Sequence, residues 1–329
     1  MENNKTEEIL IFTDIIEHNL TFIDTFAKTS SIMEEYKDKN IRIAYSGGSD
    51  SDTMMWLMKW LGYNITGVFY DTGLEYNATW KHLDYMKSKG FNIEIIKAKR
   101  SIPTSQNKYG YAFINKLVAD MLERLQLHNF DFQNDGNLSF EELWIKYPST
   151  KSALKWWTNN HNGLRNNISW NKGLKEFLIQ YGLPFKVSGK CCDGAKKLPI
   201  KQYTKENNID LMLLGIRKAE GGKRASTYIN CFVPKKTYTY SMYFPLFWWK
   251  QEDKQLFDKE MHIKHSDAYE IYGLKRTGCA GCPFGRNFEQ ELSVIKEFEP
   301  RLDKGINNIF GKAYEWTRKY NEFKKEFKK

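Results

Sequence analysis

Six consecutive residues near the start of the chain have the types and spacing of a phosphate-binding loop. A strand-like run at 41–45 enters them and a helical run at 53–61 follows, so their backbone N–H groups would face an anion. Two glycines allow close approach, and serine hydroxyls add donors. The GxxxxGK[ST] pattern of γ-phosphate transfer is missing, and outside this context a Gly-Gly pair is usually a simple turn. The residues are Ser46, Gly47, Gly48, Ser49, Asp50 and Ser51, of which Asp50 would orient the loop or hold a Mg²⁺ ion that bridges phosphates.

The chain contains five cysteines, an odd number, and its N-terminus has no recognisable export signal. A disulfide framework is therefore not expected, and metal or redox chemistry is favoured. Four cysteines form an adjacent pair, Cys191 and Cys192, and a CxxC pair, Cys279 and Cys282. Four thiolates suit an iron–sulfur or zinc centre, although zinc sites more often use two CxxC pairs. Buried cysteines without a ligand are the alternative, and Cys231 is interpreted as a structural thiol.

The loop resembles the pyrophosphate-binding SGGxDS loop of the adenine nucleotide α-hydrolase superfamily, whose members cleave ATP between its α and β phosphates. Asp71, Thr72 and Gly73 follow the next strand-like run, at 65–70, and resemble the DTG motif of the phosphoadenosine phosphosulfate (PAPS) reductase family. A lone DTG would be a strand-end turn. Because open α/β sheets bind ligands at the carboxyl ends of their strands, we expect all three residues at the nucleotide.

A third segment resembles the family's GIR…RA stretch, in which arginines face the nucleotide phosphates. It contains Gly215 and Arg217, with Arg224 seven residues later. Arginine suits this task because its planar fork binds phosphate in a bidentate manner. Outside the motif, two such arginines would more often mark a solvated loop.

The cysteine pattern resembles the [4Fe–4S] site of adenosine phosphosulfate (APS) reductases, where the tandem pair opens CCxxxKxxP. The resemblance would place Lys196 near the cluster and the nucleotide. Residues 244–253 and 272–279 are similar to two further segments of the family. The resemblance spans about 41–285, apart from an unmatched segment at 101–185.

Strand-like runs at 41–45, 65–70, 93–97 and 209–216 alternate with helical runs. This rhythm predicts an α/β fold, a parallel twisted sheet with helices on both faces, and the resemblance makes it adenine nucleotide α-hydrolase-like. The expected division is N-terminal helices (1–40), a nucleotide-binding core (41–100 and 186–236), a mostly helical insertion (101–185), and a C-terminal segment (237–329). That last segment holds the CxxC pair and a basic helix from about 301 to 329.

Residues 131–142 partly match a calcium-binding EF-hand loop. Gln133 stands where Asp or Asn is expected, so a polar connection between helices is the default and Ca²⁺ the alternative. The matching positions are Asp131, Asp135, Gly136, Ser139 and Glu142.

Composition bounds the class of protein. Hydrophobic residues make up 41% and charged residues 27%, and no apolar run approaches the ~20 residues of a membrane helix. We therefore expect a cytoplasmic protein without a membrane partner. The net charge of +10 favours an anionic partner such as DNA or tRNA, with a generally basic surface as the alternative. The aromatic residues would serve as platforms on which bases stack or, more often, as part of the core. His262 and His265 are interpreted as packed or exposed side chains rather than as metal ligands.

Two departures from the reductases guide the functional hypothesis. Sulfonucleotide reduction needs a further cysteine nucleophile, and this sequence has none after Cys282, whereas its loop is intact. The pattern favours the ATP-using branch, such as the ATP pyrophosphatase of DNA phosphorothioation systems. Such an enzyme would use ATP with Mg²⁺ and a [4Fe–4S] cluster to adenylate a substrate, with a cysteine desulfurase as sulfur donor. The alternatives are an APS or PAPS reductase with a thioredoxin-like donor, and a non-catalytic nucleotide-binding component. The candidate catalytic residues are Asp50, Lys196, Arg217 and Arg224.

Overall fold

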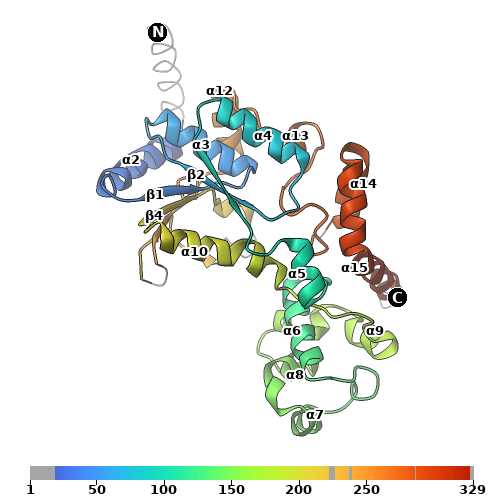
Figure 1. Ribbon diagram of the computed structural model, residues 1–329. Coiled ribbons are helices and arrows are strands. Elements are labelled where there is room, and N and C mark those ends of the chain that lie inside the picture. Colours follow the sequence, from blue (N-terminus) through green and yellow to red (C-terminus); the bar gives the residue numbers. More distant parts are fainter. Residues whose placement is uncertain (1–18, 222–226, 237–238, 286, 327–329) are drawn as a thin grey trace, which may run out of the picture. The chain divides into compact units, whose positions relative to one another are not determined.

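The computed structural model describes residues 19–221, 227–236, 239–285 and 287–326. The chain divides into two compact units, which are drawn in Figure 1. The sheet unit consists of Met1–Asp71, Glu75–Ala98 and Lys196–Gly278. The helical unit consists of Thr72–Leu74, Lys99–Ala195 and Cys279–Lys329.

The sheet unit carries one six-stranded sheet in the order β3-β2-β1-β4-β6-β5. All neighbouring pairs are parallel except β5 with β6. The chain runs outward from β1 through β2 to β3 and then returns to the other side of β1 with β4. The strand order therefore reverses between β1 and β4, which is where open α/β sheets form their binding crevice. The strands are β1 (Ile41–Ala44), β2 (Gly67–Asp71), β3 (Ile93–Lys97), β4 (Leu211–Leu214), β5 (Phe232–Val233) and β6 (Ser241–Tyr243).

Helices cover both faces of this sheet. Strand residues that point to either face are apolar, so each face has its own core. Ile43, Leu211 and Leu213 face one core, which the helices α2, α3, α4 and α12 complete. Val68 and Met212 face the other, which Tyr203 of α10 closes. Figure 1 shows α3 and α4 on one side of the strands and α10 on the other. The helices are α2 (Leu20–Glu35), α3 (Ser49–Trp60), α4 (Asn77–Ser88), α10 (Leu198–Glu206), the 3-10 turn η5 (Lys218–Glu220), α12 (Gln251–Glu260) and α13 (Asp267–Glu270).

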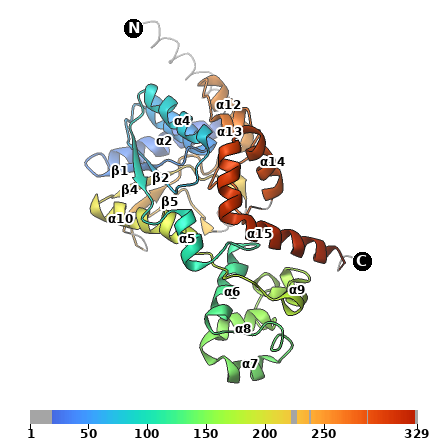
Figure 2. The same cartoon turned by 45° about the vertical axis from the view of Figure 1, so that its right-hand side comes forward.

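The helical unit has its own aromatic core, in which Trp156 and Trp157 are fully buried. Helix α15 contributes Tyr320 to this core and lies beside α14, as Figure 2 shows. Its elements are α5 (Ile102–Tyr109), α6 (Lys116–Leu127), α7 (Phe140–Lys146), η1 (Pro148–Thr150), α8 (Lys151–Trp157), η2 (Leu164–Asn166), η3 (Ile168–Trp170), α9 (Leu174–Tyr181), α14 (Phe288–Phe298) and α15 (Pro300–Glu326). A π-helix, η4 (Asp193–Lys197), joins the helical unit to the sheet unit.

The predicted α/β class, with a parallel sheet covered on both faces, is confirmed. Helix α3 begins at Ser49 rather than at 53, because the last residues of the loop already form its first turn. The strand-like runs identified in the sequence end at 216, yet the segment after 237 supplies β6. A strand of three residues is too short to show a periodic pattern. None of the helices in the described ranges combines the length and apolar character needed to cross a membrane.

Candidate functional site

The predicted phosphate loop connects β1 to α3, and Ser51 shapes it from within. Its Oγ donates to the Gly48 carbonyl at 2.7 Å and accepts from the Gly48 N–H at 3.1 Å and the Ser46 N–H at 3.3 Å. Gly47 has φ +66, and a Cβ there would lie 2.9 Å from Thr79 Cγ2. A glycine is therefore required at this turn both by backbone angle and by space.

Asp50 and Arg217, which the sequence assigned to the same site, meet in an ion pair. Arg217 Nε donates to Asp50 Oδ1 at 2.8 Å, and only 8% and 20% of the two side chains is exposed. Burial raises the pKa of Asp50, and the Arg217 guanidinium opposes this shift. Arg217 also donates to Gln251 Oε1 at 3.0 Å. Its charge is thus partly neutralised, so it would act on a phosphate together with Asp50 rather than as an isolated cation.

Gly215 explains how the ends of β1 and β4 come so close. A Cβ at this position would lie 2.8 Å from the Asp50 carbonyl oxygen and 3.1 Å from the Ser51 nitrogen. Any larger residue would push the start of α3 away from the end of β4. The loop after β1 and the turn after β4 therefore form one site at the point where the strand order reverses.

The DTG residues are divided between the two units. Asp71 ends β2 in register with Lys97 of β3. Thr72 and Gly73 belong to the helical unit. There Thr72 Oγ1 lies 3.5 Å from Cys279 Sγ, and the Leu74 carbonyl accepts from the Ala280 N–H at 2.8 Å. The sequence predicted a nucleotide role for Thr72 but did not suggest its contact with Cys279 of the CxxC segment.

All four patterned cysteines lie in the helical unit and interact with one another. A hydrogen bond with Cys192, burial, and the charges of Cys282 and Cys279 raise the pKa of Cys191 well above its usual range. Burial and the charges of Cys279 and Cys192 raise the pKa of Cys282 to about 12. The number and type of donors are those of an iron–sulfur or zinc centre. Within the described ranges, no three His, Cys, Asp or Glu side chains are already set at metal-binding geometry.

Helices α14 and α15 hold the CxxC turn in place. The Gly281 N–H donates to Glu291 Oε1 of α14 at 3.1 Å, and Tyr314 Oη of α15 donates to the Gly281 carbonyl. Gly281 has φ +62, and a Cβ there would lie 2.6 Å from Ile306 Cδ1. The C-terminal helix, which sequence reasoning described only as basic, therefore supports the second cysteine pair.

Sequence reasoning missed Lys116, the first residue of α6, because no motif includes it. Burial lowers its pKa, but the neighbouring thiol groups of Cys192, Cys282 and Cys191 raise it by more. Lys116 is thus a cation beside the cysteines, within the helical unit. Lys196, the lysine that the resemblance placed there, is half-buried on η4 and belongs to the sheet unit. Arg224 lies outside the described residues.

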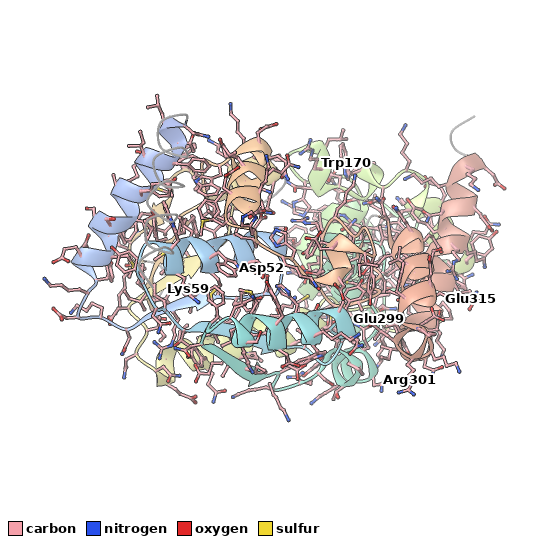
Figure 3. The ribbon with its side chains drawn as sticks, turned by 90° about the horizontal axis from the view of Figure 1, so that it is seen from above. Asp52, Lys59, Trp170, Glu299, Arg301 and Glu315 are labelled. Carbon is pink, nitrogen blue, oxygen red and sulfur yellow. The ribbon has the colours of Figure 1, made fainter. Side chains whose placement is uncertain are left out.

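A buried charge network behind the phosphate loop was also missed. His265 Nδ1 lies 2.9 Å from Asp52 Oδ2, and its Nε2 lies 3.0 Å from Asp258 Oδ2. Asp52 is fully buried on α3, where Figure 3 labels it. Lys254 donates to the same Asp258 oxygen. Burial lowers the pKa of His265, but its two carboxylate partners raise it to about 9, so the ring is an imidazolium. The acid directly after SGGSDS was the sequence signal for this network.

The EF-hand-like residues make ordinary loop and cap contacts. Asp131 accepts from the backbone N–H groups of Gln133 and Asn134, both at 3.0 Å. Asp135 binds Lys146 at 2.7 Å, and Ser139 and Glu142 form a capping box at the start of α7. These contacts are those of the polar helix–helix connection that was the default interpretation.

Comparison with known proteins places the chain in a family and shows a likeness to a distant relative and to solved structures. The family model described as the phosphoadenosine phosphosulfate reductase domain matches residues 40–132 and 154–284, including parts of the segment at 101–185 that the resemblance left unmatched. An uncharacterized protein of Methanocaldococcus jannaschii is 26% identical over 289 residues, which is 86% of this chain but 43% of that protein. The chain thus spans less than half the length of this curated relative.

A phosphoadenylyl-sulfate reductase from Candida auris, solved in complex with phosphate, is 12% identical. The match covers 73% of this chain and 81% of the other, with a TM-score of 0.40, which is too low to support an argument. The family match, in contrast, covers more than half of the chain and includes the loop, the strand ends and all four patterned cysteines. This chain therefore belongs to the phosphoadenosine phosphosulfate reductase domain family.

Proposed function

We propose that this protein is an ATP pyrophosphatase that cleaves ATP to AMP and pyrophosphate and adenylates a substrate for sulfur transfer. The observation that carries the proposal is the intact SGGSDS loop, set against Gly215 and Arg217 where the strand order reverses. A glycine- and serine-rich loop at the start of a helix suits the two terminal phosphates of ATP, which leave as pyrophosphate.

The proposed reaction has two steps. An oxygen of the acceptor attacks the α-phosphorus of ATP, and the bond to the bridging oxygen of pyrophosphate breaks. A sulfur nucleophile then attacks the activated carbon or phosphorus centre, and AMP leaves with the oxygen. Arg217 would offset the charge that develops on the leaving pyrophosphate, and a Mg²⁺ ion would supply further positive charge when bound. Asp50 keeps Arg217 oriented through their ion pair.

Cys191, Cys192, Cys279 and Cys282 would hold a [4Fe–4S] cluster. The other patterned cysteines raise the pKa of Cys191 and of Cys282, and a bound cationic centre would stabilise such neighbouring thiols as thiolates, so the donor set fits this group. When bound, such a cluster supplies electron or sulfur chemistry. Lys116 would hold a positive charge beside the thiolates, and Thr72 would lie against the Cys279 sulfur.

Pyrophosphate release from ATP by anaerobically purified protein tests the activity. It should be measured alone and with DNA or tRNA, because the net charge of +10 favours a nucleic-acid substrate. Arg217→Lys should lower the rate, since lysine cannot reproduce the bonds to Asp50 and Gln251, and Arg165→Lys on an exposed turn of the helical unit is the matched control. Absence of pyrophosphate under every condition would contradict the proposal.

The cluster has its own test. Cys191→Ser should abolish the brown colour and the bound iron of anaerobic protein, whereas Cys231→Ser, which changes a thiol packed against the sheet core, should keep both. An unchanged spectrum in Cys191→Ser would overturn the assignment.

The second candidate is a sulfonucleotide reductase, which the family membership favours. It would release sulfite from APS or PAPS, without pyrophosphate, and would draw its nucleophilic thiol from a thioredoxin-like partner. APS and PAPS are therefore run beside ATP in the same assay. A non-catalytic nucleotide-binding component would bind ATP with no product in any lane.

A further inference from the structure

Two hydroxyl groups from a later part of the sheet unit meet the phosphate loop at Gly48. Tyr269 Oη and Thr277 Oγ1 lie 2.8 Å apart. A Cβ built on Gly48 would lie 3.2 Å from the tyrosine oxygen and 3.7 Å from the threonine oxygen. Both residues therefore border the loop at the start of α3, although no loop motif includes them.

The hydrogen-bond roles of this pair follow from counting donors and acceptors. The Thr277 N–H donates to Tyr269 Oη at 3.1 Å, so this oxygen already acts as an acceptor. Among the described residues, Thr277 Oγ1 is the oxygen within hydrogen-bond distance that can accept from the phenol O–H. Burial raises the pKa of Tyr269, so the phenol keeps its proton. Its O–H therefore donates, and Thr277 Oγ1 at 2.8 Å is the acceptor.

This direction leaves the hydroxyl hydrogen of Thr277 as a donor without an acceptor among the described residues. The neighbouring Gly48 N–H is already engaged, because it donates to Ser51 Oγ at 3.1 Å. Thr277 is half-buried and lies beside the end of α3 that favours negative charge. A phosphate oxygen is the ligand that such a donor suits.

The segment that carries both residues is firmly anchored. Tyr269 lies on α13, one turn after His265, which bridges Asp52 of α3 and Asp258 of α12. At the other end, Arg276 pairs with Glu220 at 3.1 Å in the turn after β4. The segment that carries Thr277 is thus linked to α3 and α12 through His265, with a surface ion pair to the turn after β4 at its other end.

We propose that Thr277 donates its hydroxyl hydrogen to a terminal phosphate oxygen of the nucleotide held by the SGGSDS loop, and that Tyr269 is a positioning residue that orients this hydroxyl. The proposal rests on the proposed function, since it assumes a di- or triphosphate at the loop.

Calorimetric binding of inorganic pyrophosphate, ATP and adenosine tests it. Thr277→Val keeps the branched shape of the side chain but removes the donor. It should weaken the binding of pyrophosphate and of ATP about 10-fold, as expected for the loss of a hydrogen bond to a charged group. Adenosine, which has no phosphate, should bind as to the wild type. Thr277→Ser should restore pyrophosphate binding to within about threefold of the wild type.

Tyr269→Phe should weaken pyrophosphate binding less than Thr277→Val does. The double variant should bind pyrophosphate no more weakly than Thr277→Val alone, because both changes affect one donor. Thr66→Val, half-buried just before β2 at the opposite end of the sheet, is the matched control. If wild type binds pyrophosphate but Thr277→Val binds it equally well, this proposal is wrong and the proposed function stands. If wild type binds neither pyrophosphate nor ATP, the proposed function itself fails. Equal weakening of adenosine and pyrophosphate would show a structural role and overturn the proposal.

Discussion

His265 offers a quantitative test of the buried network behind the loop. Its two ring nitrogens face Asp52 and Asp258 at 2.9 and 3.0 Å, and 11% of the side chain is exposed. We would replace it with asparagine, which is close in size but has no positive charge. Asp52 and Asp258 would then be two buried carboxylates without their shared cation.

The pKa of His265 rises from 6.5 to about 9 in the folded protein, although burial alone would lower it. At about 1.4 kcal/mol per unit, the network therefore contributes about 3 kcal/mol to the free energy of unfolding. Because the folded pKa is the higher one, this stability is fully present below pH 6.5. It is lost as the pH rises through about 9.

Urea unfolding of wild type and His265→Asn between pH 6 and 9.5 measures this difference. The variant should be less stable by about 3 kcal/mol at pH 6, and the two curves should converge above pH 9. The cysteines and tyrosines titrate in both proteins, so their contribution cancels in the difference between the two free energies of unfolding. His128→Asn, which changes an exposed histidine of the helical unit, gives a baseline. A gap that stays constant with pH would refute the reasoning, as would ring-nitrogen NMR shifts of a neutral His265 at pH 7.5.

Three further outcomes are expected. Gly215→Ala should weaken ATP at least about 10-fold in calorimetry, because its Cβ would lie 2.8 Å from the Asp50 carbonyl oxygen; wild-type affinity would contradict this. Gly281→Ala should lower the content of bound iron, and it should lower the free energy of unfolding by at least about 1 kcal/mol, because Gly281 has φ +62. Unchanged iron content would argue against a cluster at this turn. Calcium titration should give no heat, since Asp131 and Asp135 already bind loop and lysine donors; micromolar binding that Asp135→Asn removes would reverse that interpretation.

Much of the sheet was predictable from short-range pattern. The run at 93–97 is a strand with the expected bounds, and β1 and β4 lie within their predicted runs. The clearest signal was that of β4, whose residues are all apolar, as is typical of a buried parallel strand. The six-residue loop was predictable because its glycines and serines stand at a fixed spacing, and a glycine such as Gly47, with φ +66, is needed where the backbone turns. Such signals are local, so the sequence determined them without knowledge of the rest of the fold.

Contacts between distant segments were decided only by the tertiary structure. Arg217 was expected to face phosphate, but its partner Asp50 lies 167 residues away in sequence, and no local pattern could show the pairing. Thr72 meets Cys279 across 207 residues, and His265 meets Asp52 across 213. The sequence determined which groups are available for chemistry. The packing of helices on the sheet decided which charges are buried together, and therefore which of those groups have altered protonation and which remain free to bind.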